Sequence, residues 1–278
     1  MRKMKIVADS SANLLTLQNV DFAAAPLKII AGEQEFVDDR HLSVEEMVDF
    51  FDSYKGRSKT SCPNPGDWLE AFGYADDIFC VTITSGLSGS YNAACVAKQM
   101  YEAENSGKRV FVIDSLSAGP ELVLLIEKLQ ELITEGCAYE DICRQVEAYT
   151  QKTGLVFVLA SLKNFAANGR VPVAVARLAG ILGIRIVGKA SQEGTLQPLD
   201  KSRGEAKALE KLLEHMGAAG FRQGKVRIAH CANGAAAETF MQMVLNKYPQ
   251  AQVQISSCLG LCSYYAEKGG LLVGYEKF

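Results

Sequence analysis

Hydrophobic and polar positions alternate with two different periods along the first half of the chain. Short apolar, partly β-branched runs at 5–8, 78–84 and 109–113 have the length and composition of buried strands. The stretch 90–104 has helical spacing and is long enough for a right-handed crossover between two parallel strands. These patterns predict an α/β fold with a parallel sheet and helices on its faces.

A second group of patterns lies between the first two of these strands. Residues 26–30 form another apolar run, Gly32 can turn the chain, and 35–37 continue as a strand candidate. Ser43-Val44-Glu45-Glu46 has the Ser-x-x-Glu form of a capping box, which predicts a helix from there through Tyr54.

The pattern changes after two helical stretches at 121–135 and 139–152. Two strand candidates, 185–189 and 195–198, flank the polar turn Ser191-Gln192-Glu193-Gly194, as in an antiparallel hairpin. The other expected elements are strands at 155–159 and 226–230 and near Val253 and Leu272, and helices at 204–216 and 235–247. We therefore expect two domains: an N-terminal α/β domain over 1–153, and a C-terminal α+β domain over 154–278 with a mixed or antiparallel sheet.

Length and composition agree with two globular domains. The chain has 278 residues, of which 48% are hydrophobic and 22% charged, so a mainly disordered chain is excluded. Lysine plus arginine number 29 and aspartate plus glutamate 32, which gives a net charge of -3. Because there is no basic excess to attract a phosphate backbone, nucleic acid is not an expected partner.

No signal peptide or transmembrane segment is expected. Ile6-Val7-Ala8 is too short an apolar stretch for a signal peptide, and the apolar stretch 171–187 is interrupted by two arginines. We therefore expect a cytoplasmic protein whose eight cysteines are reduced and mostly buried. Cys258 and Cys262 have no second pair and no nearby histidine, so neither a metal site nor another cofactor is predicted.

Three polar clusters follow predicted strands, which is where open α/β sheets place their ligands. They are Asp9-Ser10-Ser11, Thr60-Ser61-Cys62-Pro63-Asn64-Pro65 and Thr84-Ser85-Gly86-Leu87-Ser88-Gly89-Ser90. In the third cluster, glycines let the backbone approach a ligand closely, and the following helix aims N–H groups at it. Hydroxyls of the second and third clusters could together hold a small anionic head group.

A structural interpretation competes with the functional one at each cluster. Serine and threonine before a helix most often cap it, and we assign Ser10-Ser11 to that class. The third cluster has more hydroxyls than one cap can use, so we expect it to contact a ligand. Asn168-Gly169-Arg170 could present its arginine to a carboxylate or phosphate, with a surface arginine as the alternative.

Catalytic motifs match only in part. Gly86-Leu87-Ser88-Gly89-Ser90 departs from the G-x-S-x-G nucleophile elbow at its fifth position and lacks the lysine of a phosphate-binding P-loop. The three histidines, His41, His215 and His230, do not combine with a serine and an acid into a convincing triad. A serine-dependent hydrolase or transferase acting through Ser88 therefore stands as the alternative to a binding protein.

Taken in order along the chain, these segments resemble the DegV family of bacterial fatty-acid-binding proteins, nearly end to end. The two most specific signatures are Thr60-Ser61-Cys62-Pro63 and Ser85-Gly86-Leu87-Ser88-Gly89-Ser90-Tyr91. The other matching segments are Ile6-Val7-Ala8-Asp9-Ser10-Ser11, Pro26-Leu27, Asp38-Asp39, Asp114-Ser115 with Ser117 and Gly119, Asn168-Gly169-Arg170-Val171 and Lys201-Ser202-Arg203-Gly204.

The resemblance implies that a long-chain fatty acid lies in an apolar tunnel between the two domains, with its carboxylate held by hydroxyls. The implied ligand-binding residues are Thr60, Ser61, Ser85, Gly86, Ser88 and Arg170, and the choice between the two hydroxyls of each loop stays open. Some family members present the acid to a separate ATP-using kinase subunit, so such a subunit is the expected protein partner. The chain itself is then expected to be a lipid-binding protein, with no catalytic residue.

Two departures from the family pattern bear on this expectation. Cys62 stands where members usually have glutamine. Near the C-terminus, members often carry a histidine followed by Gly-Pro-Gly, at the head-group end of the site. This chain instead reads Cys262-Ser263-Tyr264-Tyr265-Ala266-Glu267-Lys268-Gly269-Gly270. Lipid binding is therefore expected to persist, whereas delivery to a kinase is in question.

Overall fold

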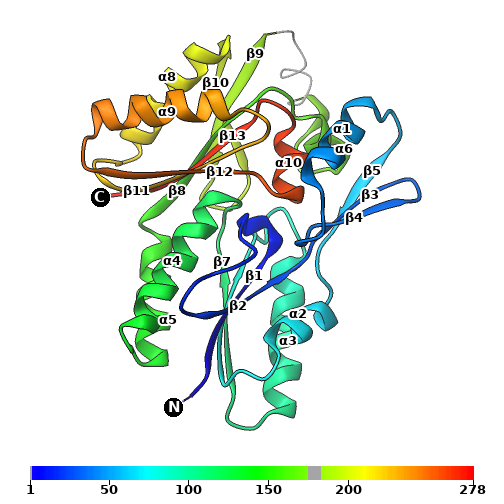
Figure 1. The fold of residues 1–278 in the computed structure, drawn as a ribbon, viewed down its shortest axis with the longest axis vertical. Coiled ribbons are helices and arrows are strands. Elements are labelled where there is room, and N and C mark those ends of the chain that lie inside the picture. The colour runs from blue at the N-terminus through cyan, green and yellow to red at the C-terminus, as the bar shows by residue number, and fades with distance from the viewer. Residues whose placement is uncertain (1, 175–182) are drawn as a thin grey trace.

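The computed structural model describes residues 2–174 and 183–278, whose strands form two large sheets and a smaller one (Figure 1). The first large sheet is parallel, with the strand order β2-β1-β6-β7. Its strands are β1 (Met4–Asp9), β2 (Asp21–Ala25), β6 (Asp77–Thr82) and β7 (Arg109–Asp114). The predicted α/β fold of the first half, with its parallel sheet, is therefore confirmed.

Helices cover both faces of the parallel sheet because successive residues of a strand point to opposite faces. Ile6 and Phe79 point to one face, and Val7 and Ile78 to the other. The first face is covered by α4 (Pro120–Thr134) and α5 (Tyr139–Thr150), and the second by α2 (Pro65–Phe72) and α3 (Ser90–Glu104). The crossover helix predicted at 90–104 is present with those bounds.

The smaller sheet is antiparallel, with the order β4-β3-β5. Its strands are β3 (Lys28–Ala31), β4 (Gln34–Val37) and β5 (Ser58–Ser61), and α1 (Val44–Ser53) lies between β4 and β5 in the chain. The strand predicted at 26–30 therefore lies outside the parallel sheet. Pro26 has no N–H to donate, and the Leu27 N–H donates to Ser10 Oγ at 3.0 Å, so β3 separates from β2 and pairs with β4 across Gly32.

The second large sheet is mixed, with the order β10-β9-β8-β13-β11-β12. All neighbouring pairs are antiparallel except β11 and β12. Its strands are β8 (Thr153–Leu159), β9 (Ile184–Ala190), β10 (Leu196–Arg203), β11 (Gly224–His230), β12 (Ala251–Ser257) and β13 (Leu271–Glu276). The predicted hairpin is thus formed by β9 and β10, and the mixed sheet of the second half is confirmed.

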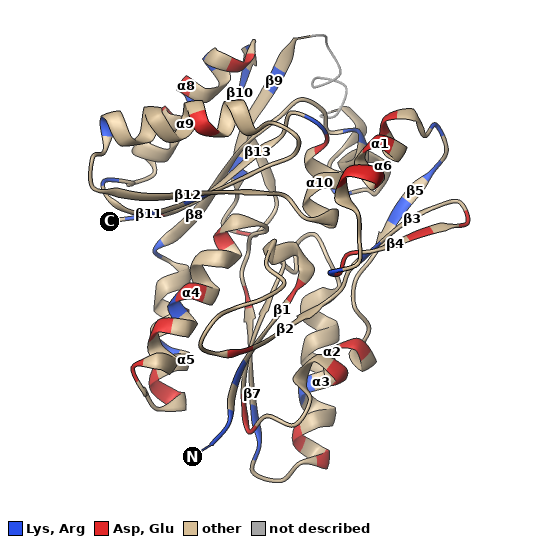
Figure 2. Ribbon diagram, in the orientation of Figure 1, with Lys and Arg blue, Asp and Glu red and all other residues tan. Residues whose placement is uncertain are grey.

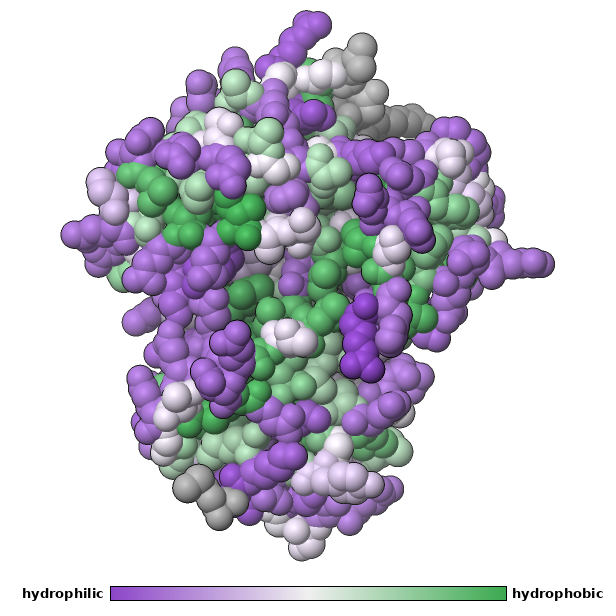
Figure 3. Space-filling view, viewed as in Figure 1, coloured by the Kyte–Doolittle hydropathy of each residue, from purple (hydrophilic) through white to green (hydrophobic). Residues whose placement is uncertain are grey.

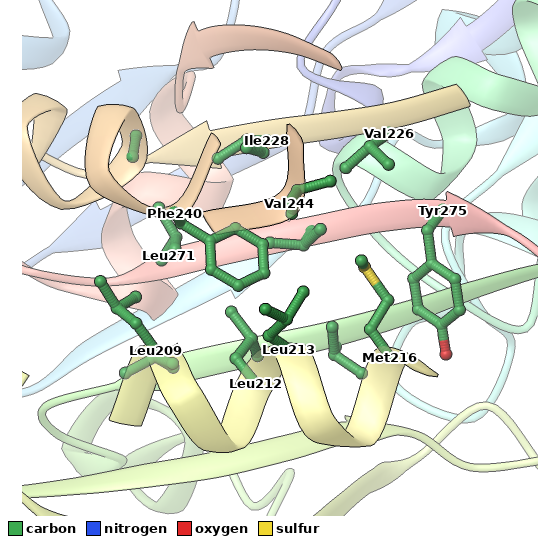
Figure 4. Close-up of a cluster of buried hydrophobic side chains, with 14 of the residues drawn as sticks. Leu209, Leu212, Leu213, Met216, Val226, Ile228, Phe240, Val244, Leu271 and Tyr275 are labelled. Atoms are coloured by element: carbon green, nitrogen blue, oxygen red, sulfur yellow. The ribbon is translucent and has the colours of Figure 1, made fainter. Parts of the chain in front are cut away.

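One face of the mixed sheet is covered by α8 (Glu205–Ala218) and α9 (Gly234–Lys247). Leu212, Phe240 and Leu271 lie together in the core between these helices and the strands (Figure 4). Two short helices, α6 (Lys163–Ala167) and α10 (Gly260–Ala266), lie near the small sheet, and α10 was not predicted. The domain boundary expected between 153 and 154 falls at the start of β8 and stays a prediction.

Charge and hydropathy are distributed differently over the surface. Figure 2 shows basic residues on β5 and β9 and acidic residues on α1, α2 and α5. Figure 3 shows hydrophobic residues gathered in the middle of one face, at the level where the two large sheets approach each other. Within the described ranges, no helix is both long and apolar enough to span a bilayer. Residues 175–182 of the apolar stretch 171–187 lie outside those ranges.

Candidate ligand-binding site

A cavity of about 300 Å³ lies between the segments of the first half and the mixed sheet, a volume at the lower end of small-molecule sites. Its lining is mostly apolar, with a smaller group of polar side chains. The apolar residues are Leu27, Ile83, Leu87, Ala118, Leu155, Phe157, Leu159, Phe165, Ala190, Leu196, Leu261, Ala266 and Leu272. Because the lining comes from both halves of the chain, neither half forms the cavity alone.

The alternation of side chains along β8 gives the cavity one apolar wall. Leu155, Phe157 and Leu159 point into the cavity, whereas Val156 and Val158 point into the core beneath α8 and α9. Both faces of β8 are apolar, so its sequence is a continuous apolar run. The run 155–159 therefore predicted a buried strand but did not indicate that one of its faces lines a cavity. The wall follows from the pairing of β8 with β9 and β13 in the centre of the sheet.

The polar part of the cavity lining includes a pair of hydroxyls. Thr60, on β5, and Tyr265, on α10, both line the cavity, and their hydroxyl oxygens lie 2.8 Å apart. Burial raises the pKa of Tyr265, so the phenol keeps its proton at neutral pH. Whichever hydroxyl donates to the other, one proton of the pair stays free to donate to a ligand.

Asn168 fixes the backbone of this corner. Its Oδ1 accepts the Thr60 N–H at 3.2 Å, and its Nδ2 donates to the Tyr264 hydroxyl at 3.0 Å. The Tyr264 hydroxyl also lies 2.7 Å from Ser58 Oγ. The amide of Asn168 therefore ties β5 to α10 and holds Thr60 beside Tyr265.

Ser88 and Arg170 add further donors to the same cavity. Ser88 Oγ accepts the Ser90 N–H at 3.2 Å, which leaves the hydroxyl proton of Ser88 free to donate. Arg170 Nε donates to the Leu87 carbonyl at 2.9 Å, and Nη1 donates to the Asn168 carbonyl. Nη2 has no recorded acceptor among residues 2–174 and 183–278, and a guanidinium with free N–H groups suits a carboxylate.

The structure separates the six residues expected to bind the ligand into two groups. Thr60, Ser61, Ser88 and Arg170 line the cavity, and the remaining two do not. Ser85 is exposed, and its N–H donates to Asp114 Oδ1 at 3.0 Å. Gly86 packs against the turn between β9 and β10, where an added Cβ would lie 2.8 Å from the Glu193 carbonyl oxygen.

The three histidines are not among the residues that line the cavity. His215 is paired with Asp200, and His230 Nδ1 accepts the Asn233 N–H at 3.2 Å. All eight cysteines are free thiols, and burial raises the pKa of Cys262, which lines the cavity, so it is a poor nucleophile.

Sequence reasoning missed Tyr265 as a site residue. It lies on the short helix α10, in the segment 262–270. That segment was singled out only because it lacks the family's histidine and Gly-Pro-Gly. The Tyr265 ring packs on Phe165, with the centroids 4.6 Å apart, and this contact directs the phenol toward Thr60. No local pattern marks such a role, because the partners lie on α6 and β5, about 100 and 205 positions away.

Comparison with known proteins gives consistent matches over the whole chain. A family model described as an uncharacterised protein of the DegV family matches residues 3–277. A DegV domain-containing protein of Streptococcus pneumoniae is 41% identical over 276 residues, which cover 98% of each chain.

Solved structures of other proteins share the fold. A DegV family protein of Eubacterium eligens loaded with heptadecanoic acid has a TM-score of 0.97 and 44% identity, covering 99% of this chain and all of that one. The fatty acid kinase (Fak) B3 protein of Streptococcus pneumoniae loaded with linoleic acid has a TM-score of 0.97 and 41% identity, with the same coverage.

Proposed function

Because the chain belongs to the DegV family, we propose that it binds a long-chain fatty acid in the cavity between its two large sheets. The observation that carries this proposal is the division of the cavity lining into apolar walls and a smaller group of hydroxyl and guanidinium donors, which Asn168 and Leu87 link by hydrogen bonds. The fatty acids bound by the Eubacterium eligens and Streptococcus pneumoniae proteins support it.

The energetics agree with a carrier. Burying a sixteen-carbon chain contributes on the order of 10 kcal/mol, at about 0.8 kcal/mol per methylene. Association costs several kcal/mol of that in lost translational and rotational freedom. We infer that the acyl chain supplies most of the affinity, whereas Ser88, Arg170 and the Thr60–Tyr265 pair orient the carboxylate.

The first test is native mass spectrometry of the protein purified from a bacterial host without added lipid, followed by denaturing analysis of the bound material. We expect one fatty acid per chain. A protein that is empty and also fails to bind added palmitate or oleate would contradict the proposed function.

The head-group assignment has its own test, because Ser85 and Ser88 lie in the same loop and differ in their exposure to the cavity. Ser88→Ala should weaken palmitate binding about tenfold, since a hydrogen bond to a charged group contributes roughly 1.5 kcal/mol. Methyl palmitate, which has no charge, should lose much less affinity. Ser85→Ala is the matched control and should leave both affinities unchanged; the reverse result would assign the contact to Ser85.

We further propose that the chain presents its fatty acid to a separate kinase subunit, which transfers the γ-phosphoryl group of ATP to the carboxylate and leaves an acyl phosphate and ADP. The likeness to the Fak B3 protein supports this role. The test is an assay with labelled ATP and the ATP-binding subunit of a fatty acid kinase. Acyl phosphate should form only when that subunit and the loaded chain are both present, and its absence would contradict the partnership.

A further inference from the structure

The Asp9 carboxylate is fully buried beneath the loop that carries Ser88. Its Oδ2 accepts the Ile83 N–H at 2.8 Å and the Ser90 hydroxyl at 2.6 Å. Its Oδ1 accepts both the N–H and the hydroxyl of Ser11, which lies in the 3₁₀ turn η1 (Ser10–Ala12). Asp9 therefore binds both Ile83 and Ser90, the residues on either side of the loop 84–89.

The loop between these two ends is held in part by its own bonds, since the Gly86, Leu87 and Ser88 N–H groups donate to Thr84. It contains Gly86 and Gly89, which restrict the backbone little, and the residue before α3 is Gly89, which has no side chain to cap the helix. The Ser90 N–H donates to Ser88 Oγ at 3.2 Å. A chain of hydrogen bonds thus runs from Asp9 through Ser90 to the hydroxyl that faces the cavity.

We propose that Asp9 is a positioning residue that acts through Ser90 and Ile83 to set the place of the Ser88 hydroxyl in the carboxylate site. The inference rests on the proposed function, because it concerns the same site. Neither Asp9 nor Ser90 lines the cavity, so both act on the ligand only through the loop. Ser10-Ser11 were expected to cap a helix, whereas the residue that caps η1 is Asp9, which accepts the Ser11 N–H.

A buried carboxylate is costly, and this one is satisfied by hydrogen bonds. Burial raises the pKa of Asp9, and the bonds from Ser11, Ser90 and Ile83 act against that rise. The charge of Asp9 also helps to raise the pKa of Asp38, whose carboxylate binds the start of α10. Because Asp9 accepts hydrogen bonds from Ile83 and Ser90, it restrains the two ends of the loop 84–89 relative to each other.

The test compares affinities for palmitate and for methyl palmitate in Ser90→Ala and Asp9→Asn. Palmitate affinity should fall about fivefold, as expected when one hydrogen bond to a charged group is misplaced, while the ester should change by less than about twofold. The matched control is Asp77→Asn. Asp77 is as buried as Asp9 and pairs with Arg2 and Arg109 at the start of β6, and it contacts neither the loop nor the cavity lining, so both affinities should stay unchanged.

Equal losses for acid and ester, or no loss in Ser90→Ala, would overturn the assignment, because a role in stability alone does not distinguish the two ligands. If Asp9→Asn fails to fold, Ser90→Ala decides, with Ser90→Thr as the variant that keeps the hydroxyl and should restore the preference for the acid.

A second measurement separates this proposal from the proposed function. Amide hydrogen exchange of the ligand-free protein should rise over 84–89 in Ser90→Ala and stay unchanged in Asp77→Asn. If the wild type binds no lipid, the proposed function fails, and the exchange data still decide whether Asp9 holds the loop. Unchanged exchange in Ser90→Ala would overturn the positioning role on its own.

Discussion

Asp38 lies in the loop after β4 and caps a helix that begins 222 positions later. Its carboxylate accepts the Gly260 N–H at 2.7 Å and the Leu261 N–H at 2.9 Å, at the start of α10. Burial raises the pKa of Asp38 to about 6, and the bonds from Leu261, Ser10 and Gly260 limit that rise. A single carboxylate therefore holds the helix that brings Tyr265 to the cavity.

This pKa predicts how stability depends on pH. Because the folded state binds the proton of Asp38 more tightly than the unfolded state, the stability this group contributes is complete below about pH 4 and is lost as pH rises through about 6. Relative to Asp38→Asn, the wild type should lose up to about 3 kcal/mol of unfolding free energy between pH 4 and 7.

Urea unfolding at a series of pH values measures this difference. Asp39→Asn, one position away and closer to solvent, controls for the loss of a negative charge and should keep the pH dependence of the wild type. A difference between wild type and Asp38→Asn that is constant with pH would show that Asp38 does not titrate in this range.

At the scale of elements, helices and strands with a strong periodic pattern could be predicted from the sequence. Elements whose formation depends on residues far away in the chain could not. The helix over 90–104 and the hairpin of β9 and β10 carry their signals locally, in spacing and turn residues. The helix α10 has only seven residues and no capping residue of its own, because Asp38 supplies its cap. The strand β5 is the polar stretch Ser58–Ser61, which only its pairing with β3 makes a strand.

The same distinction applies to the site. Thr60, Ser61, Ser88 and Arg170 could be named as candidates because their loops have recognisable composition and order, and the structure places these four along one cavity. The structure does not place Ser85 there, because its N–H binds Asp114 and turns the loop outward at that point. The sequence does not reveal which side of a loop faces a cavity, since that depends on what packs against the loop.

The turn between β9 and β10 packs on this loop through Gly194. Its φ of 71° favours glycine, and an added Cβ would overlap Thr84 Oγ1 and lie 3.0 Å from Leu116 Cα. Gly194→Ala should therefore destabilise the protein by about 1–3 kcal/mol beyond the strain of a positive φ, and should speed fatty-acid release, because the turn forms a wall of the cavity.

Chemical denaturation and stopped-flow displacement of a fluorescent fatty acid measure the two effects. Gly136→Ala is the matched control, since Gly136 has a φ of 75° and nothing within 4 Å of an added Cβ. Equal effects of the two substitutions would mean that backbone strain alone, and not the contact with Thr84, accounts for the result.

At the scale of the whole molecule, an ion cluster joins the mixed sheet to α4, a helix that covers the parallel sheet. Arg227, on β11, donates to both carboxylate oxygens of Glu127, on α4, at 2.6 and 2.7 Å. Lys225 lies 3.3 Å from Glu127 and also pairs with Glu131. The side chains of Arg227 and Glu127 are 9% and 19% exposed, so their pairing is weakly screened by salt.

Glu127→Gln should lower the unfolding free energy by about 3 kcal/mol, because it leaves the buried guanidinium of Arg227 without its counter-charge. Thermal and urea unfolding measure the loss, which should change little with ionic strength. Glu135→Gln, an exposed position just after the same helix, should have an effect within about 0.5 kcal/mol. A similar loss in both variants would indicate a general charge effect and no specific contribution from the cluster.

The walls of the cavity are drawn from segments at opposite ends of the chain. The Leu259 N–H donates to Asn13 Oδ1 across 246 positions, and the Cys262 thiol donates to the Ser11 carbonyl across 251. During synthesis, the partners near the N-terminus leave the ribosome long before α10 does, and contacts at such separations form late in folding. The cavity is therefore expected to close last, so that only chains whose translation and folding are both complete take up lipid.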